Sequence, residues 1–418
     1  MSGIGGGWAD SMSVGVLATA VPRDAVDTAI AVTRRGAKRS GGKLPPHVMV
    51  YYAMALSLFA DDDYEEVMTR LAGTLASWGC WDPGWDIPTT GGITQARQRL
   101  GAEPLAEVFD TVAVPVADEL TQGAFLGPWR LMSIDGFEWD APDTDANVAE
   151  FGYSGGTGEK ASAFAKVRVL TIAECASHAV VATRIGGRGT GGKRQGEQTL
   201  ARRLWPALAE DWLLIADSGF YSYQDWSKAA ATGAALLWRL PATVKTPKLM
   251  DLDDGSYLSV LINKTVRSTT RRAEILQTAR DGGDLDPAEA TVVRVIEYTV
   301  PDRGPDPDEV IRVITTIGDP ADAPAEILAQ AYHQRWEHET GNDQLKTHLR
   351  GPGRVLRSKS PDMIRQEIYG YLLTHYAIST LICRAATEAD IDPDRVKFLR
   401  TVRLVRRQTT SGPAAFSP

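Results

Sequence analysis

The order of apolar segments between residues 129 and 240 constrains the fold of this chain more than any other feature of its sequence. Runs of large apolar residues typical of buried strands are separated by Gly-containing turns, and helical patterns follow the third and fourth runs. The order β-β-β-α-β-α-β predicts an α/β core. The five predicted strands occupy residues 129–135, 163–172, 178–185, 212–217 and 234–240.

Segments of a different character flank these strands. The N-terminal part has helical patterns, including an apolar run at 48–59 that predicts a buried helix. Residues after 240 form β-rich runs broken by Gly, Pro and Asp, and helical patterns return at 324–350 and 361–387. We therefore expect an all-α N-terminal domain at 1–125, the first part of the core at 126–240, a β-rich insertion at 241–325 and the second part of the core at 326–418.

Composition excludes several classes of protein. The chain has 418 residues, of which 43% are hydrophobic and 23% charged, so it is neither disordered nor fibrous. No apolar stretch reaches the roughly 18 residues of a membrane span, and the N-terminus does not resemble a secretory signal. The three cysteines form no CxxC pair, which gives no support to a zinc knuckle or a disulfide framework. We expect a cytoplasmic protein with no membrane partner.

Two aspartates follow apolar strands in similar surroundings. Asp135 lies in Ile-Asp-Gly-Phe and Asp217 in Ala-Asp-Ser-Gly-Phe, so both are expected to end a strand before a turn. Functional groups in open α/β sheets collect at the carboxyl ends of strands. Each aspartate could instead cap a strand end and bond turn amides. A third acid would complete a site for two divalent cations that act on a phosphodiester.

The best candidate for the third acid is Glu339. On a helix that advances 100° per residue, Tyr332, Arg335, Glu339 and Lys346 fall within an arc of about 60°. Such a polar face is not a core-facing stripe. Asp343 lies near the same face and is a rival third acid, and an Arg335–Glu339 ion pair on a solvated surface is the structural alternative.

The spacing Tyr332-x2-Arg335-x3-Glu339-x6-Lys346 resembles the Y-R-E-K signature of IS4-family DDE transposases. Asp135 and Asp217 resemble the first and second catalytic aspartates of that family, and Glu339 corresponds to its glutamate. The segment 44–67, together with 94–97, resembles the N-terminal domain of bacterial members. The resemblance covers roughly residues 20–410.

The resemblance implies an RNase H-like core, with a mixed five-stranded sheet and flanking helices, interrupted by a β-rich insertion. It implies two Mg²⁺ or Mn²⁺ ions held by Asp135, Asp217 and Glu339. It also implies a nucleoid-associated bacterial enzyme that cuts at the ends of an insertion sequence and joins the 3′-hydroxyl to target double-stranded DNA, as a homodimer on that DNA. The N-terminal domain would serve end recognition or assembly.

Basic residues extend the expected DNA contacts. Residues 331–418 contain 14 Lys and Arg against 9 Asp and Glu, although the whole chain has a net charge of −8. The segment 395–407 predicts a basic amphipathic helix, for which we favour phosphate binding over a solvated face. His333 and His338 are expected on the surface or near DNA. The predicted DNA contacts are Tyr332, Arg335, Lys346, Arg350, Arg354, Arg357, Lys359, Arg400, Arg403 and Arg407.

Two departures from the family pattern bear on mechanism. No tryptophan occurs between Trp238 and Trp336, whereas members that cut through a hairpin intermediate use one in the insertion to stack a flipped base. Tyr257 or Tyr298 is the alternative stacking residue. The chain ends at Pro418, before the further basic stretch of related sequences, which predicts weaker dimerisation or activity. The alternative functions are an RNase H-like endonuclease without strand transfer and a DNA-binding derivative without catalysis.

Overall fold

A computed structural model describes residues 14–37, 44–77, 86–154, 162–187, 196–299 and 310–408. Its N-terminal part is helical, as expected, and Asp63 caps the fourth helix by accepting a hydrogen bond from the Glu66 amide (2.8 Å). No helix within these ranges is long and apolar enough to cross a bilayer. The N-terminal helices are α1 (Val14–Ala20), α2 (Arg23–Val32), α3 (Pro46–Leu58), α4 (Tyr64–Ser77), α5 (Thr90–Leu100) and α6 (Glu103–Val112).

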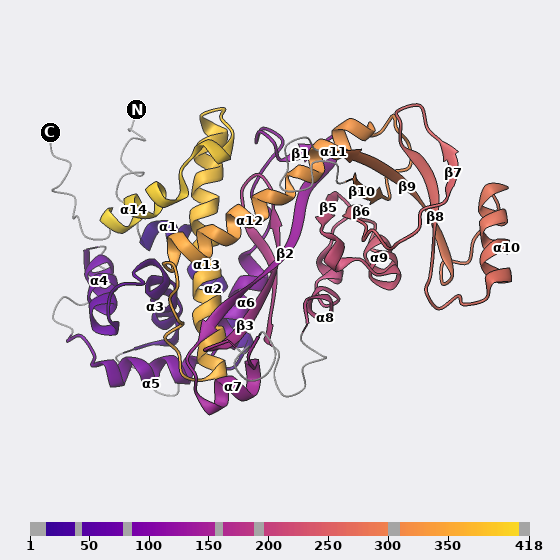
Figure 1. The fold of residues 1–418 in the computed structure, drawn as a ribbon. Helices are drawn as coiled ribbons and strands as arrows, with labels where there is room; N and C mark the ends of the chain where they lie inside the picture. The colour runs from indigo at the N-terminus through magenta and orange to yellow at the C-terminus, as the bar shows by residue number, and fades with distance from the viewer. Residues whose placement is uncertain are drawn as a thin grey trace.

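A mixed sheet forms the centre of the molecule (Figure 1). Its first strands form an antiparallel meander, β2–β3–β4, and β5 and β6 then continue the sheet in parallel with β2, in the order β4-β3-β2-β5-β6. This is the mixed five-stranded sheet of the expected RNase H-like fold. Its elements are β1 (Phe125–Leu126), β2 (Trp129–Ala141), α7 (Asp145–Phe151), β3 (Ala165–Glu174), β4 (Val180–Gly187), α8 (Glu197–Ala201), β5 (Trp212–Ala216), α9 (Tyr223–Ala230) and β6 (Ala235–Arg239).

Asp135 does not end its strand, contrary to expectation. Strand β2 continues through Gly136 to Ala141 and stays paired with β3 along this length. The continuation is held because Phe137, Trp139 and Ala141 alternate into the core. On the other side of β2, pairing with β5 ends at Ser133. Asp135 therefore lies where β2 extends beyond its parallel neighbour.

The insertion extends the same sheet rather than forming a separate one. Strand β10 pairs antiparallel with β6, and β9, β8 and β7 follow outward (Figure 1, right). The helix α10 was not expected, because only Ile275 of its side chains is buried and its sequence has no apolar stripe. The insertion comprises β7 (Lys248–Asp251), β8 (Tyr257–Ile262), α10 (Thr269–Arg280), β9 (Ala290–Thr299) and β10 (Val310–Thr315).

The segment 324–350 was expected to be one helix and is divided in the structure. One helix ends before Gln334, the next begins at Arg335, and a π-helical turn closes the segment. Such π turns are rare and frequently lie at functional sites. The C-terminal elements are α11 (Ala325–His333), α12 (Arg335–Asp343), η6 (Gln344–Leu349), α13 (Pro361–Glu388), η7 (Pro393–Arg395) and α14 (Phe398–Gln408).

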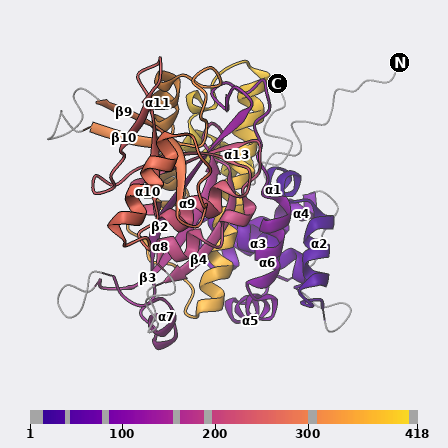
Figure 2. The same cartoon turned by 90° about the vertical axis from the view of Figure 1, so that its right-hand side faces the viewer.

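Helix α13 joins the N-terminal helices to the sheet. It runs between them in both ribbon views (Figures 1 and 2), and a single apolar cluster spans residues of α1–α6, β2–β4 and α13. Tyr371 packs edge-on against Trp139 of β2, with ring centroids 5.2 Å apart. On the opposite side Gly370 lies so close to α3 that a Cβ there would meet the Ala53 carbonyl oxygen at 2.5 Å.

This close approach predicts that two Gly→Ala substitutions change the free energy of unfolding in opposite directions. Gly370→Ala should destabilise the fold by about 1–3 kcal/mol, because backbone must move to admit the methyl group. Gly73→Ala in α4 is the control, since nothing lies within 4 Å of its new Cβ and helix propensity alone should add up to about 1 kcal/mol. Urea unfolding measures both, and equal effects would contradict the packing of α13 on α3.

Candidate active site

Asp135 lies in β2, and Asp217 directly follows the neighbouring strand β5. The parallel register pairs Ser133 with Ile215, and each aspartate follows two residues later. Burial raises the pKa of Asp135, as does the negative charge of Asp217, while the Gly136 amide and the cations Arg335 and Lys346 lower it. The Asp217 carboxylate accepts a hydrogen bond from the Ser218 amide. The site therefore gathers negative charge that positive groups must balance.

His338 connects helix α12 to the sheet, close to these aspartates, through two hydrogen bonds. The imidazole is buried, with Nδ1 2.8 Å from Ser133 Oγ and Nε2 2.8 Å from Thr171 Oγ1. Burial lowers its pKa to about 3, so the ring is neutral. The expectation of a surface or DNA-proximal His338 was wrong, because its partners lie on β2 and β3, far away in the sequence.

One turn further along the same helix face, Asn342 donates to Asp135 Oδ2 at 3.1 Å. Asn342 was not singled out from the sequence, and His338 was not assigned this role. Their i,i+4 spacing places both on one side of the helix, and this is the signal that could have found them.

The signature residues converge on the same place. Tyr332 and Arg335 are buried, and Asp217 acts electrostatically on both. Burial and then Asp217 raise the pKa of the Tyr332 phenol above its ordinary value. Lys346, in the π turn, is close enough to act on Asp135. The structure thus brings Tyr332, Arg335 and Lys346 around the two aspartates.

Glu339 differs from the aspartates in its exposure and in its hydrogen-bond partner. Its side chain is 43% exposed, and its carboxylate accepts a hydrogen bond from Arg335 Nη2 at 2.9 Å. This is the i,i+4 pair that the structural alternative required. The rival acid Asp343 is exposed and accepts a hydrogen bond from Thr347 Oγ1 at 2.6 Å.

The three acids suit hard divalent cations in chemistry, since all their donors are carboxylate oxygens. Their ligand atoms do not all lie within 4.8 Å of one another. Glu339, which is paired with Arg335, is therefore not gathered with the two aspartates into a single-ion site in this structure. Burial of Asp135 beside Asp217 favours the binding of positive charge there.

Three arginines expected to contact DNA have protein partners instead. Arg350 is buried with its guanidinium 5.1 Å from the centroid of the Trp139 ring. Arg354 and Arg357 donate to the Ala60 carbonyl, and Arg354 also pairs with Asp61. The hydrogen bonds of Arg354 and Arg357 connect the C-terminal part of the chain to the loop between α3 and α4. Their contacts therefore give no support to the prediction that they bind DNA.

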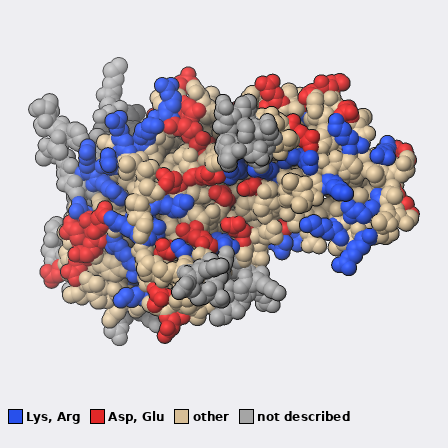
Figure 3. Space-filling model, viewed as in Figure 1, with Lys and Arg blue, Asp and Glu red and all other residues tan. Residues whose placement is uncertain are grey.

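The remaining basic residues of the prediction are exposed. Helix α14 buries Phe398, Val402 and Val405 and exposes Arg400, Arg403 and Arg407. Its Arg406 is partly buried and donates to the Leu58 carbonyl at 2.6 Å. Figure 3 shows Lys and Arg side chains gathered over the region of α14 at the upper left, with a second group over the insertion at the right. These exposed residues are Lys359, Arg400, Arg403 and Arg407, and Arg354, which pairs with Asp61, is exposed as well.

Two family models match this chain. One, described as insertion element 4 transposase N-terminal, matches residues 11–110, and the other, a transposase DDE domain, matches residues 129–376. The second model spans more than half of the chain and includes Asp135, Asp217, Glu339 and Lys346.

The chain is also similar to individual proteins. Transposase InsG for insertion sequence element IS4 of Escherichia coli is 25% identical over 373 residues, 87% of this chain and 76% of InsG. Putative transposase InsZ of the same organism is 24% identical over 38% of this chain and 52% of its own length. A piggyBac transposase, solved as a synaptic complex with hairpin DNA, covers 97% of this chain and 82% of its own, with a TM-score of 0.47 and 10% identity.

The buried His338 predicts a pH dependence of stability. Its folded pKa of about 3 lies below the ordinary 6.5, so the unfolded chain binds more protons as pH falls below 6.5. Stability should be unaffected by this group above pH 6.5 and should decrease below it, by roughly 1.4 kcal/mol per pH unit. Urea unfolding between pH 8 and 5 should show a shallower loss for His338→Gln, and parallel profiles would contradict a neutral buried imidazole.

Proposed function

Because the chain belongs to the IS4 family of DDE transposases and is a DNA transposase, we propose that it cuts at the ends of an insertion sequence and joins the resulting 3′-hydroxyl to target DNA. The observation that carries the proposal is the arrangement of Asp135 and Asp217 side by side, with Arg335 and Lys346 acting on the same carboxylates. The similarity to InsG supports the same reaction class.

Asp135, Asp217 and Glu339 would hold two Mg²⁺ or Mn²⁺ ions. When bound, such ions activate a water or hydroxyl oxygen and stabilise the leaving oxygen of a phosphodiester. Asp135 and Asp217 are fixed by the sheet, and Asn342 orients the Asp135 carboxylate through its amide. Glu339 is the mobile member, because its exposed side chain must turn from Arg335 toward the aspartates to complete the site.

That movement would release Arg335 for DNA. The guanidinium now donates to Glu339, and without that partner its donors can take a phosphate oxygen pair. Tyr332 and Lys346 would contact neighbouring phosphates, with Lys346 as a point charge. The Glu339 side chain then couples the binding of cations to the binding of the DNA backbone by Arg335.

Exposed basic residues of α14, including Arg400 and Arg403, would extend the DNA contact away from the cut. The resemblance to the family favours a homodimer on DNA, in which each chain would bind one transposon end.

Replacing the third acid tests the catalytic assignment. Glu339→Gln should reduce Mg²⁺-dependent nicking of the element's own end sequence by a factor on the order of 10³, while end binding is retained. The matched change Asp343→Asn should leave nicking near the wild-type level. Cleavage that survives Glu339→Gln but is lost in Asp343→Asn would show that Asp343 is the third acid.

The joining step separates a transposase reaction from that of a simple endonuclease. Precut ends carrying a free 3′-hydroxyl should be joined to plasmid DNA by the purified protein with Mg²⁺. Nicking without joining would favour the endonuclease alternative, and end binding without nicking would favour a derivative that has lost catalysis.

A phosphate contact by Lys346 predicts a specific salt effect. Lys346→Ala should weaken end binding and reduce the slope of log K against log salt by about 0.9, the value for one phosphate on double-stranded DNA. Fluorescence anisotropy at several salt concentrations measures this slope. An unchanged slope would show that Lys346 acts on Asp135 alone.

A further inference from the structure

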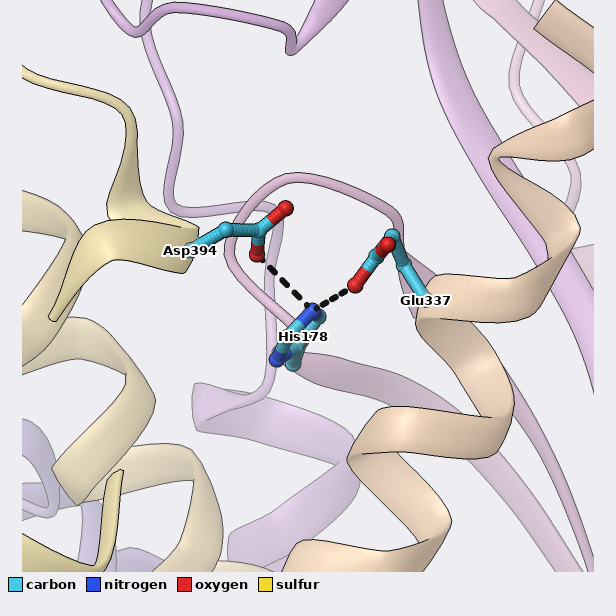
Figure 4. A group of neighbouring side chains, drawn as sticks. All are labelled: His178, Glu337 and Asp394. Atoms are coloured by element: carbon cyan, nitrogen blue, oxygen red, sulfur yellow. Dashed lines mark hydrogen bonds and ion pairs between the residues drawn. The ribbon is translucent and has the colours of Figure 1, made fainter. Parts of the chain in front are cut away.

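A second group of possible ligands lies outside the three acids. His178 Nε2 lies 3.1 Å from Glu337 Oε2 and 3.3 Å from Asp394 Oδ1, and the three ligand atoms all lie within 4.8 Å of one another (Figure 4). We call His178, Glu337 and Asp394 the His178 cluster. Among the described residues it is the one such group of His, Cys, Asp and Glu.

The three residues come from separate elements. His178 lies in the turn between β3 and β4, Glu337 in α12 and Asp394 in η7, just before the basic helix α14 (Figure 4). Glu337 and Glu339 are two residues apart on one helix, so their side chains project about 200° apart. The His178 cluster is therefore distinct from the proposed catalytic acids.

The spacing within the cluster fits a small cation. Tetrahedral bonds of about 2.0–2.2 Å, as His nitrogen and carboxylate oxygen make to Zn²⁺, place neighbouring ligand atoms about 3.4 Å apart. The two distances from His178 Nε2 are close to this value. An ion between the three atoms would require little movement of the side chains.

A side-chain amide contacts the second nitrogen of the His178 imidazole, the position at which metal-binding histidines have a hydrogen-bond partner. The Gln344 amide nitrogen lies 2.8 Å from His178 Nδ1, and the amide oxygen lies 3.0 Å from His375 Nε2. With the amide turned by 180°, its oxygen accepts a hydrogen bond from Nδ1–H, and the Nε2 lone pair faces the carboxylates and an ion between them. His375 accommodates either amide orientation, because burial keeps its ring neutral and Nε2 can then donate or accept.

A cavity adjoins the cluster and provides the remaining coordination space. It has a volume of about 550 Å³ and is lined by all three cluster residues, by Gln344 and by Ser379. The Ser379 side chain is 1% exposed, and its Oγ has no hydrogen-bond partner among the described residues. A buried hydroxyl without a partner costs free energy, which a ligand or water bound in this cavity would recover.

We propose that His178, Glu337 and Asp394 form a structural or regulatory site for Zn²⁺ or a similar transition-metal ion, with an open position toward the cavity that Ser379 lines. A mixed set of one imidazole and two carboxylates suits such ions better than Mg²⁺ or Ca²⁺, which take oxygen ligands. The bound ion would tie the β3–β4 turn, α12 and the start of α14 to one another. It would thereby set the position of the exposed Arg400 and Arg403 relative to α12.

Cobalt binding to the full chain tests the site. The background is Asp217→Asn, which weakens the proposed catalytic site so that ions there do not obscure the result. One Co²⁺ per chain should bind and give the visible absorption of four- or five-coordinate cobalt, Zn²⁺ should displace it, and the unfolding temperature should rise with either ion.

Two substitutions in the cluster and one outside it complete the test. Asp394→Asn and His178→Asn should each weaken binding more than about a hundredfold. Asparagine tolerates the positive φ of +58° at His178, so this variant should fold. His348→Asn changes another histidine of the same cavity and should leave binding unchanged.

Two outcomes would overturn the proposal. One is the absence of stoichiometric Co²⁺ or Zn²⁺ binding by the folded chain, which would leave the cluster as an ion pair of His178 with two carboxylates. The other is cobalt binding that persists in both His178→Asn and Asp394→Asn. Neither outcome bears on cleavage, so the assignment of the three catalytic acids is tested separately.

Discussion

The two negative charges of Asp135 and Asp217, held close together by parallel pairing of β2 and β5, are the constraint on which the arrangement of the site depends. Asp135 and Asp217 are held at the same level of the sheet, where β2 continues and β5 ends. Nearby positive charge lowers the free energy of two neighbouring carboxylates. Here Arg335 of α12 and Lys346 of the π turn supply that charge. The hydrogen bonds of His338 to Ser133 and Thr171 hold α12 in the position that makes this possible. The packing of α12 on the sheet therefore also determines where Arg335 lies relative to the two carboxylates.

Packing beyond the site follows from helix α13. Its apolar sides contact both the N-terminal helices and the sheet, so these parts share one core. Arg354 and Arg357 add hydrogen bonds from the segment after the π turn to the loop between α3 and α4. The N-terminal helices are thereby connected to the element that carries Lys346.

The sequence predicted the order of the strands and the gathering of the signature residues, because apolar periodicity and residue spacing are local properties. It did not predict that Asp135 lies within a strand, since the Asp-Gly pair is typical of a turn and only pairing with β3 shows otherwise. It placed His338 on the surface because the hydroxyls that bind it lie 205 and 167 residues away. It did not predict the hydrogen bonds of Arg354 and Arg357 to the Ala60 carbonyl, because that carbonyl is nearly 300 residues distant. Each miss comes from a long-range contact of a polar group.

The central claim is that Glu339 leaves Arg335 to join Asp135 and Asp217 around two cations. The most direct measurement is anomalous diffraction from crystals of the chain bound to its end DNA and Mn²⁺. The account predicts two manganese peaks about 3.5–4 Å apart, both contacted by these three carboxylates, with Arg335 on a phosphate. Manganese bound elsewhere, with Glu339 still paired to Arg335, would contradict it.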